Sequence, residues 1–264
     1  VVGVGHFEPL RHYAEVHLLM EPGEPNSGIQ TETLCSEDKL DRNWQRLIIT
    51  HITEKAHLGV LTGSPITDIK ITLVNGRAHQ KHTEGGDFRQ ATYRAIRNGL
   101  MQAESVLLEP WYSFEITVPT ELSGRVMTDV TKMGGEFSSP VTEGESAVIS
   151  GKAPVSEMNS YNYQLTDFSR GKGKISLRFN GYRPCHNREK VIEEKGYNPE
   201  NDVDNPRDSV FCSHGAGHVV KWYDVPQNMH LESFLKPKKE ETEETFTAPT
   251  QTRVRGYLRS LEDD

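Results

Sequence analysis

The pattern of hydrophobic and polar residues predicts several β-strands in the first third of the chain. Residues 16–20 and 29–34 look like strands and are separated by a turn rich in glycine and proline. Residues 69–73 alternate strictly, which predicts a strand with one face toward water. Asn75-Gly76 follows at once, and this dipeptide is a strong hairpin signal. We therefore expect a return strand through residues 77–82.

Two longer stretches place their hydrophobic residues at helical spacing. Residues 36–58 predict a helix with one apolar face, in which Ser36, Asp38 and Asp41 offer caps or acidic residues for the first turn. A second helix is predicted from Asp87 onward, on apolar residues recurring from Phe88 to Leu100. The polar, partly basic segment 77–86 would be held out between the hairpin and this helix. These elements predict an α+β domain over residues 1–108.

A second unit begins near Trp111 and has a different order of elements. The pattern predicts strand, helix, two strands joined by a turn around Gly144, helix and a final strand. The order βαββαβ is that of a ferredoxin-like domain, which we place at residues 109–183. The predicted elements are a strand at 114–118, a helix at 120–133, strands near 137 and at 147–151, a helix at 155–168 and a strand at 175–179.

Residues 184–264 form a C-terminal extension with weaker patterning. Residues 187–195 are compatible with a short helix, and residues 210–222 mix apolar residues with cysteine, histidine and glycine. Residues 236–245 are a charged, low-complexity run that we expect to be mobile. Residues 253–261 could begin another helix.

Composition narrows the possible functions. The chain has 264 residues, enough for two domains, and a net charge of −8, which disfavours a general nucleic-acid binder. Any contact with RNA would have to be local. No run approaches the ~20 apolar residues of a membrane helix. The three cysteines cannot all pair, which fits a reducing, cytoplasmic setting. Val1-Val2-Gly3 without a signal peptide suggests a fragment of a longer protein.

Three stretches carry a resemblance to a known family. They are GSPITDIKITLVNGRAH at 63–79, EGGDFRQATYRAIRNGL at 84–100 and PVSEMNSYNYQLTDFSRGKG at 154–173. Together with LLEPW at 107–111 they resemble the fourth and fifth domains of elongation factor G, and more closely the tetracycline-resistance ribosomal protection proteins. The resemblance runs from about residue 5 to residue 182. It implies an arm that reaches the decoding centre of the small ribosomal subunit.

Segment 77–86 is the main candidate site. Arginine and lysine can contact phosphates, histidine can stack or donate, and glutamine and threonine can reach base edges. From the residues alone, an ordinary solvated tip is the alternative; the resemblance implies contact with ribosomal RNA. Protection proteins carry a proline near Lys81, where this chain has Gln80-Lys81-His82, so ribosome binding is implied more directly than drug displacement. The residues concerned are Arg77, His79, Gln80, Lys81, His82 and Thr83.

Two further segments are candidates for contact with RNA. The segment 7–13 precedes the first predicted strand, and the resemblance places such a loop beside the first tip. Arg11, His12 and Tyr13 could pair with phosphates or stack on a base, or the loop could simply pack on its neighbour. Arg170, Lys172 and Lys174 read as a helix C-cap with basic residues. Contact with the stalk base of the large subunit is their secondary interpretation, implied by the resemblance.

Cysteine and histidine in the extension raise an alternative function. Cys185-His186 and Cys212-Ser-His214 are zinc-ligand types, although their spacing is not the usual C-x₂-C. Buried thiols near one another are the simpler interpretation. The rival hypothesis is a metal-binding regulatory or interaction module centred on residues 183–218.

Catalysis is not expected in this chain. No G-x-x-x-x-G-K-[ST] loop and no nucleophile elbow occur. GTP and Mg²⁺ would belong to the N-terminal GTPase domains that the resemblance implies as partners. We therefore expect no cofactor here, with zinc as the exception that the rival hypothesis would require.

Overall fold

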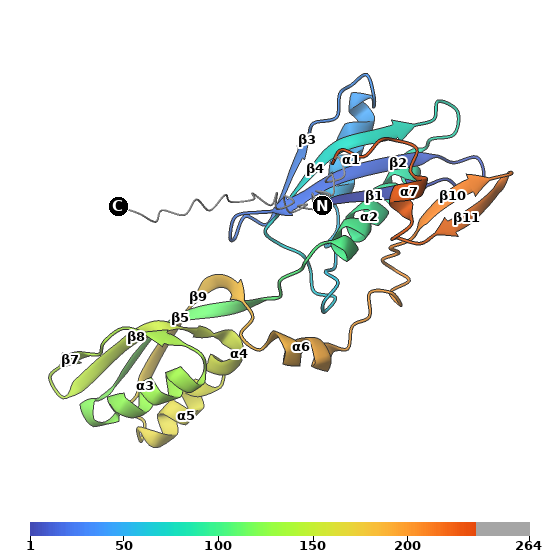
Figure 1. Ribbon diagram of the computed structural model, residues 1–264. Coiled ribbons are helices and arrows are strands. Elements are labelled where there is room, and N and C mark those ends of the chain that lie inside the picture. Colours follow the sequence, from blue (N-terminus) through green and yellow to red (C-terminus); the bar gives the residue numbers. More distant parts are fainter. Residues whose placement is uncertain (236–264) are drawn as a thin grey trace, which may run out of the picture. The chain divides into compact units, whose positions relative to one another are not determined.

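The computed structural model describes residues 1–235, which form two separate β-sheets with helices (Figure 1). The first sheet has six strands in the order β11-β10-β1-β2-β4-β3. All neighbours are antiparallel except β1 with β10 and β3 with β4, which are parallel. The strands are β1 (Val2–Phe7), β2 (Ala14–Pro22), β3 (Ile29–Thr33), β4 (Ile69–Ala78), β10 (Ser209–Ser213) and β11 (Ala216–Val220).

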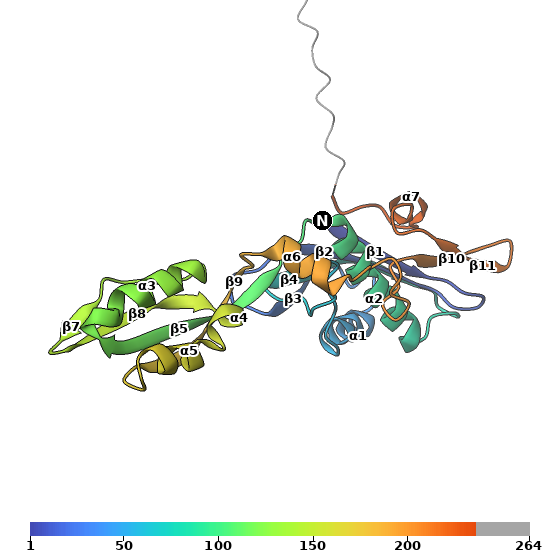
Figure 2. The same ribbon diagram turned by 90° about the horizontal axis from the view of Figure 1, so that it is seen from below.

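Two helices, α1 (Arg42–Thr53) and α2 (Gly85–Gln102), cover one face of this sheet (Figure 2). The core between them is built from alternate residues of β2 and β4 and from the apolar faces of both helices. α2 begins with a capping box in which Glu84 and Asp87 each bind the other's backbone N–H. The predicted α+β domain is confirmed, with a core of Ala14, Val16, Leu18, Met20, Ile48, Ile52, Ile71, Leu73, Phe88, Ala91, Ala95 and Ile96.

The first strand, β1, is not predicted by the sequence pattern. It contacts α2 through Gly3 and Gly5, whose faces lie directly on the helix backbone near Ala91 and Ala95. Glycine has a low strand propensity, so this stretch carried no strand signal. The absence of side chains is what lets the strand approach the helix so closely.

The predicted hairpin turn at Asn75-Gly76 is wrong. β4 runs without interruption from Ile69 to Ala78 and pairs with β2 along its whole length. The register shifts beside this dipeptide, where His17 faces Asn75 but Leu18 faces Leu73. The Asn-Gly pair thus accompanies a β-bulge inside the strand, and no return strand exists at 77–82.

The first predicted helix is shorter than residues 36–58. α1 begins after Asp41, whose carboxylate accepts the N–H of Asn43 at 2.8 Å. Ser36 to Leu40 form a turn, and the helix ends at Thr53. The side-chain cap at Asp41 sets this start.

A polar network around Glu54 joins the end of α1 to α2. Glu54 accepts hydrogen bonds from Tyr93, Arg89 and His51, the last two at 2.9 Å. The hydrogen bond from Tyr93, with those from Arg89 and His51, lowers the pKa of Glu54 to about 2 from 4.5. Burial and the neighbouring carboxylate raise the pKa of Tyr93 to about 12.

Glu54→Gln should therefore lower the free energy of unfolding at neutral pH by about 1 kcal/mol. A lowered folded-state pKa stabilises above the unfolded value of 4.5 and loses its effect as pH falls toward 2. The difference between variant and parent should shrink across that window. Urea denaturation at several pH values measures it; a difference that stays constant from pH 7 to pH 3 would contradict the assignment.

The second sheet contains the predicted βαββαβ order. Its strands follow the order β6-β8-β5-β9, with β7 paired to β8, and α3 and α5 lie on one face (Figure 1). The ferredoxin-like prediction is confirmed, although the predicted helix 155–168 is divided into α4 and α5. The elements are β5 (Leu108–Pro119), η1 (Thr120–Leu122), α3 (Ser123–Lys132), β6 (Glu136–Phe137), β7 (Val141–Glu143), β8 (Ser146–Pro154), α4 (Val155–Met158), α5 (Tyr161–Phe168) and β9 (Lys174–Pro184).

The chain after β9 returns to the first sheet. α6 (Arg188–Lys195) confirms the predicted short helix, and β10 and β11 then extend the sheet beyond β1. α7 (Val225–Asn228) follows. Val225 joins Val2, Val4, Phe211 and Val220 in an apolar cluster on the face of β1 opposite α2.

Two expectations concern the remaining residues. The mobile run at 236–245 and the helix at 253–261 lie outside the residues that the structure describes. Within residues 1–235, none of the helices has the length and apolar character needed to cross a membrane.

Candidate nucleic-acid interface

Strand pairing brings the two predicted tip segments to the same end of the first sheet. Phe7 pairs with Ala14, and Ala14 pairs with Ala78. The β1–β2 loop (residues 8–13) and the β4–α2 loop (residues 79–84) therefore lie next to each other at the same end of the strands (Figure 1). The second loop connects a strand to a helix and is not the tip of a hairpin.

The β4–α2 loop is exposed and internally ordered. His79, Gln80, Lys81 and His82 are exposed, and the two histidine rings stack with centroids 4.4 Å apart. The Thr83 hydroxyl accepts the N–H of His79 at 2.7 Å and donates to the carbonyl of Tyr13 at 2.6 Å. Thr83 thereby ties the two loops together and leaves the four preceding side chains open to a partner.

The β1–β2 loop presents some of its predicted contacts and buries others. Arg11 is exposed and has a positive φ of 65°. His12 lies 2.9 Å from Asp87 at the start of α2. Tyr13 is only 7% exposed and lies beneath the guanidinium of Arg77, so its ring is not free to stack on a base. Tyr13 supports the loops from below.

Next to Tyr13 lies a buried carboxylate that is not among the residues predicted from the sequence. Glu15 is fully buried on the sheet face opposite α1 and α2. Its oxygens lie 2.9 Å from His6 Nδ1 and 2.7 Å from His17 Nε2. They also accept the backbone N–H groups of His230 and Leu231 at 2.9 and 3.0 Å. Residues 230 and 231 are thus bound to the face of the first sheet opposite α1 and α2, next to Tyr13 and the two loops.

The surroundings of this carboxylate fix its charge. Burial alone raises the pKa of Glu15, but hydrogen bonds from His17, His6 and the His230 backbone outweigh it and hold the pKa well below its usual range. Burial, together with the nearby Glu15, raises the pKa of Tyr13. The Tyr13 hydroxyl lies 3.1 Å from His230 Nδ1. An ionised carboxylate and a neutral tyrosine therefore lie below the exposed loops.

The basic run in the second domain is a helix end, as predicted. Arg170 and Gly171 have positive φ values of 54° and 78°, and the Gly171 N–H bonds to the Thr166 carbonyl at 2.8 Å. Lys172 and Lys174 follow it and are exposed. Their contact with the stalk base stays a prediction.

The cysteine and histidine pairs lie on different sheets. Cys185 and His186 follow β9, and His186 Nδ1 lies 2.7 Å from Glu109. Cys212 is on β10, and His214 is in the turn after it. Among residues 1–235, only His6, Glu15 and His230 form a group of three histidine, cysteine or acidic side chains whose ligand atoms all lie within 4.8 Å of one another. The hydrogen bonds described above for Glu15 already occupy its two oxygens, which disfavours a metal ion there.

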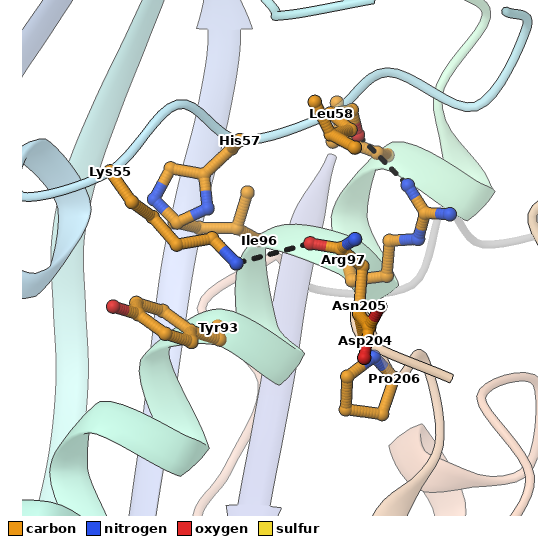
Figure 3. A pocket seen from close by; sticks show the side chains of 10 residues that line it. Lys55, His57, Leu58, Tyr93, Ile96, Arg97, Asp204, Asn205 and Pro206 are labelled. Atoms are coloured by element: carbon orange, nitrogen blue, oxygen red, sulfur yellow. Dashed lines mark hydrogen bonds between the residues drawn. The ribbon is translucent and has the colours of Figure 1, made fainter. Parts of the chain in front are cut away.

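A small cavity elsewhere in the first domain has a structural role. It has a volume of about 20 Å³, room for about one water molecule. Lys55 and Arg97 line it, together with Asn205 of the C-terminal segment (Figure 3). Lys55 Nζ bonds to Asn205 at 3.1 Å, and Arg97 binds the Leu58 carbonyl at 2.8 Å. The first contact holds the chain around Asn205 beside the end of α1, and the second ties the loop after α1 to α2.

Comparison with known proteins agrees with this architecture. Residues 6–104 match the family model for elongation factor G, domain IV, and residues 106–192 match that for the elongation factor G C-terminus. The chain is 30% identical over 184 residues to elongation factor G 1 of Synechocystis sp., covering 69% of this chain and 26% of that protein. A crystal structure from Thermus thermophilus superposes with a TM-score of 0.67 at 26% identity, covering 74% of this chain and 30% of that one.

Two domains of this kind in this order define a protein similar to translation elongation factors. More narrowly, the chain belongs to the elongation factor G family, of which it carries domain IV and the C-terminal domain. It spans about a quarter of the length of the curated relative it matches. The matched parts do not include the GTPase domain, so the predicted absence of a catalytic nucleotide site from these two domains is consistent with the comparisons.

Proposed function

We propose that this chain is the ribosome-binding arm of an elongation-factor-G-like GTPase and that its two exposed loops enter the decoding region of the small subunit. The observation that carries the proposal is the pairing of the β1–β2 and β4–α2 loops at one end of a domain-IV fold. Four consecutive exposed residues, from His79 to His82, include no carboxylate. Such a surface suits a phosphate backbone even though the whole chain is acidic.

Further parts of the proposal follow from the family. The GTPase domains would be the chain's own partner and would hold GTP and Mg²⁺, and the arm would work in the cytoplasm, where ribosomes are. The second domain, with Arg170, Lys172 and Lys174, would face the stalk base of the large subunit. Kinship with the tetracycline-resistance proteins remains part of this proposal, and release of the drug from ribosomes is the assay that addresses it.

The experiment replaces Lys81 and His82 with alanine. Both side chains are exposed, so folding should be unchanged, whereas affinity for small ribosomal subunits should fall about tenfold. The slope of log affinity against log salt should decrease by about 1, the share of one lost phosphate contact. Titration of labelled chain with subunits at several salt concentrations measures both.

A matched control replaces Lys190 and Lys195, which are exposed on α6. Tyr197, just after α6, lies against Gly63 before the start of β4, so this variant loses two basic side chains away from the loops and should bind like the parent. Equal affinities for the parent and the Lys81/His82 variant would overturn the proposed function.

A further inference from the structure

The turn of the β10–β11 hairpin lies at the same end of the first sheet as the two loops. β10 is parallel to β1, with Phe7 opposite Val210, and the Glu8 N–H continues the ladder by bonding to the Val210 carbonyl at 2.8 Å. β1 and β10 therefore both run toward the loops, and the turn at 213–216, which follows β10, lies at that end of the sheet (Figure 1). Gly217 of β11 lies against Pro9, since a Cβ on it would be 3.6 Å from the Pro9 Cα.

The hairpin is held firmly on its inner side. Phe211 is 5% exposed and stacks on the His6 ring at 3.9 Å, with an angle of 1° between the planes. The buried Ser209 hydroxyl accepts the His6 N–H at 3.0 Å. Asp208 accepts the backbone N–H of Trp222 at 3.0 Å just beyond the hairpin. The hairpin is therefore preorganised, and binding a partner would cost little conformational entropy.

The hairpin is exposed on its outer side and has no acidic residue of its own, while the neighbouring Glu8 carboxylate accepts the backbone N–H of Cys212 at 3.4 Å. Residues 209–220 contain no aspartate or glutamate, although the chain has 38 of them and a net charge of −8. Ser213, His214 and His218 are exposed. The turn passes through positive φ at His214 and Gly215, and a Cβ on Gly215 would have no atom within 4 Å. The turn is therefore open to close approach by a partner at Gly215.

We propose that the turn of the β10–β11 hairpin is a third RNA-contacting loop, which binds the phosphate backbone of ribosomal RNA beside the β1–β2 and β4–α2 loops. The proposal rests on the proposed function and extends its surface to a strand pair outside the residues matched by either family model. Hydroxyl and imidazole donors at an exposed turn with no acidic residue of its own favour phosphate as the ligand, and the neighbouring Glu8 carboxylate is already paired with His6 and the Cys212 backbone N–H. A protein partner is the competing outcome.

The test introduces charge repulsion by replacing His214 and His218 with glutamate. Two carboxylates facing phosphates should lower affinity for isolated small subunits about tenfold or more, and the loss should be greater at low salt. The matched control, Gln30→Glu with Leu34→Glu, places the same charges on exposed positions at the opposite edge of the same sheet. It should bind like the parent.

The outcomes separate the two proposals. If the parent binds and the His214/His218 variant binds equally well, the hairpin proposal is overturned and the proposed function stands. If the parent itself does not bind, both are overturned.

A second measurement identifies the partner as RNA or protein. An iron chelate attached at Ser213→Cys, with the three native cysteines replaced, should cleave small-subunit RNA by hydroxyl radicals. Attachment at Gly86→Cys, exposed beside the β4–α2 loop, in the same background is the positive control. Cleavage from Gly86→Cys without cleavage from Ser213→Cys would overturn contact of the hairpin with RNA.

Discussion

Replacing Glu15 with glutamine should lower the free energy of unfolding of the first domain by about 3 kcal/mol. The carboxylate accepts hydrogen bonds from two histidine rings and from the backbone of His230 and Leu231, and it is fully buried. Glutamine keeps the shape but turns one acceptor into a donor, which would face donors in a site closed to water. Hydrogen exchange of the buried amides of β2 during urea denaturation measures the loss.

The expected pH dependence adds a second readout. The pKa of Glu15 is lowered in the folded state, so its contribution is complete above the unfolded pKa of 4.5 and is lost as pH falls below it. The deficit of the variant should therefore narrow in acid. Glu21→Gln, at an exposed position of the same strand, is the control and should cost no more than about 0.5 kcal/mol. A Glu15 variant as stable as this control would refute the role of the buried carboxylate.

Gly5→Ala should destabilise the first domain by about 3 kcal/mol or more, because the strand and helix backbones leave no space for a methyl group. A Cβ on Gly5 would lie 1.8 Å from the Ala91 carbonyl oxygen and 2.5 Å from the Ala95 nitrogen. Real Cβ atoms do not approach so closely, and the obstructing atoms are backbone that cannot rotate away. β1 would have to move off α2. Thermal unfolding of the variant measures the effect.

The control for Gly5 is Gly86→Ala, in the first turn of α2. A Cβ there would have no atom within 4 Å, and alanine favours a helix. This variant should be as stable as the parent or more stable by about 0.5–1 kcal/mol. A Gly5 variant that melts with the parent would show that β1 is not packed against α2 as described.

The second domain shows how much the sequence alone could predict. Its strands alternate cleanly, as in Phe114, Ile116 and Val118, because one face meets the helices and the other meets water. Glycines mark its turns at positions 134 and 144, both with positive φ. Local pattern and tertiary environment agree, so the order of elements followed directly from the pattern.

The first domain departs from its local signals where the backbone has unusual neighbours. Asn75-Gly76 reads as a turn, but a Cβ on Gly76 would lie 2.8 Å from Leu40 Cδ2, so glycine here allows the strand to pack closely against the Leu40 side chain. Gly3 and Gly5 weaken the strand signal for the same reason. In both places glycine allows close packing, and a sequence pattern cannot distinguish this use from a turn.

The candidate site divides in a similar way. The polar segment before α2 was visible in the sequence, and its side chains from His79 to His82 are exposed in the structure. Glu15 and His17 alternate with apolar residues and so resemble the wet face of a strand. They are buried because segment 221–231, more than 200 residues away in the chain, covers that face.

Local sequence pattern was enough to establish the type and order of most elements, the second domain and the polar loop before α2, since these depend on neighbours within a few residues. Three features became visible only in the folded chain: β1 packs against α2, β10 and β11 complete the first sheet, and the buried carboxylate of Glu15 lies next to the loops. Those features depend on contacts between distant parts of the chain, whose energies appear only when two surfaces meet and exclude water.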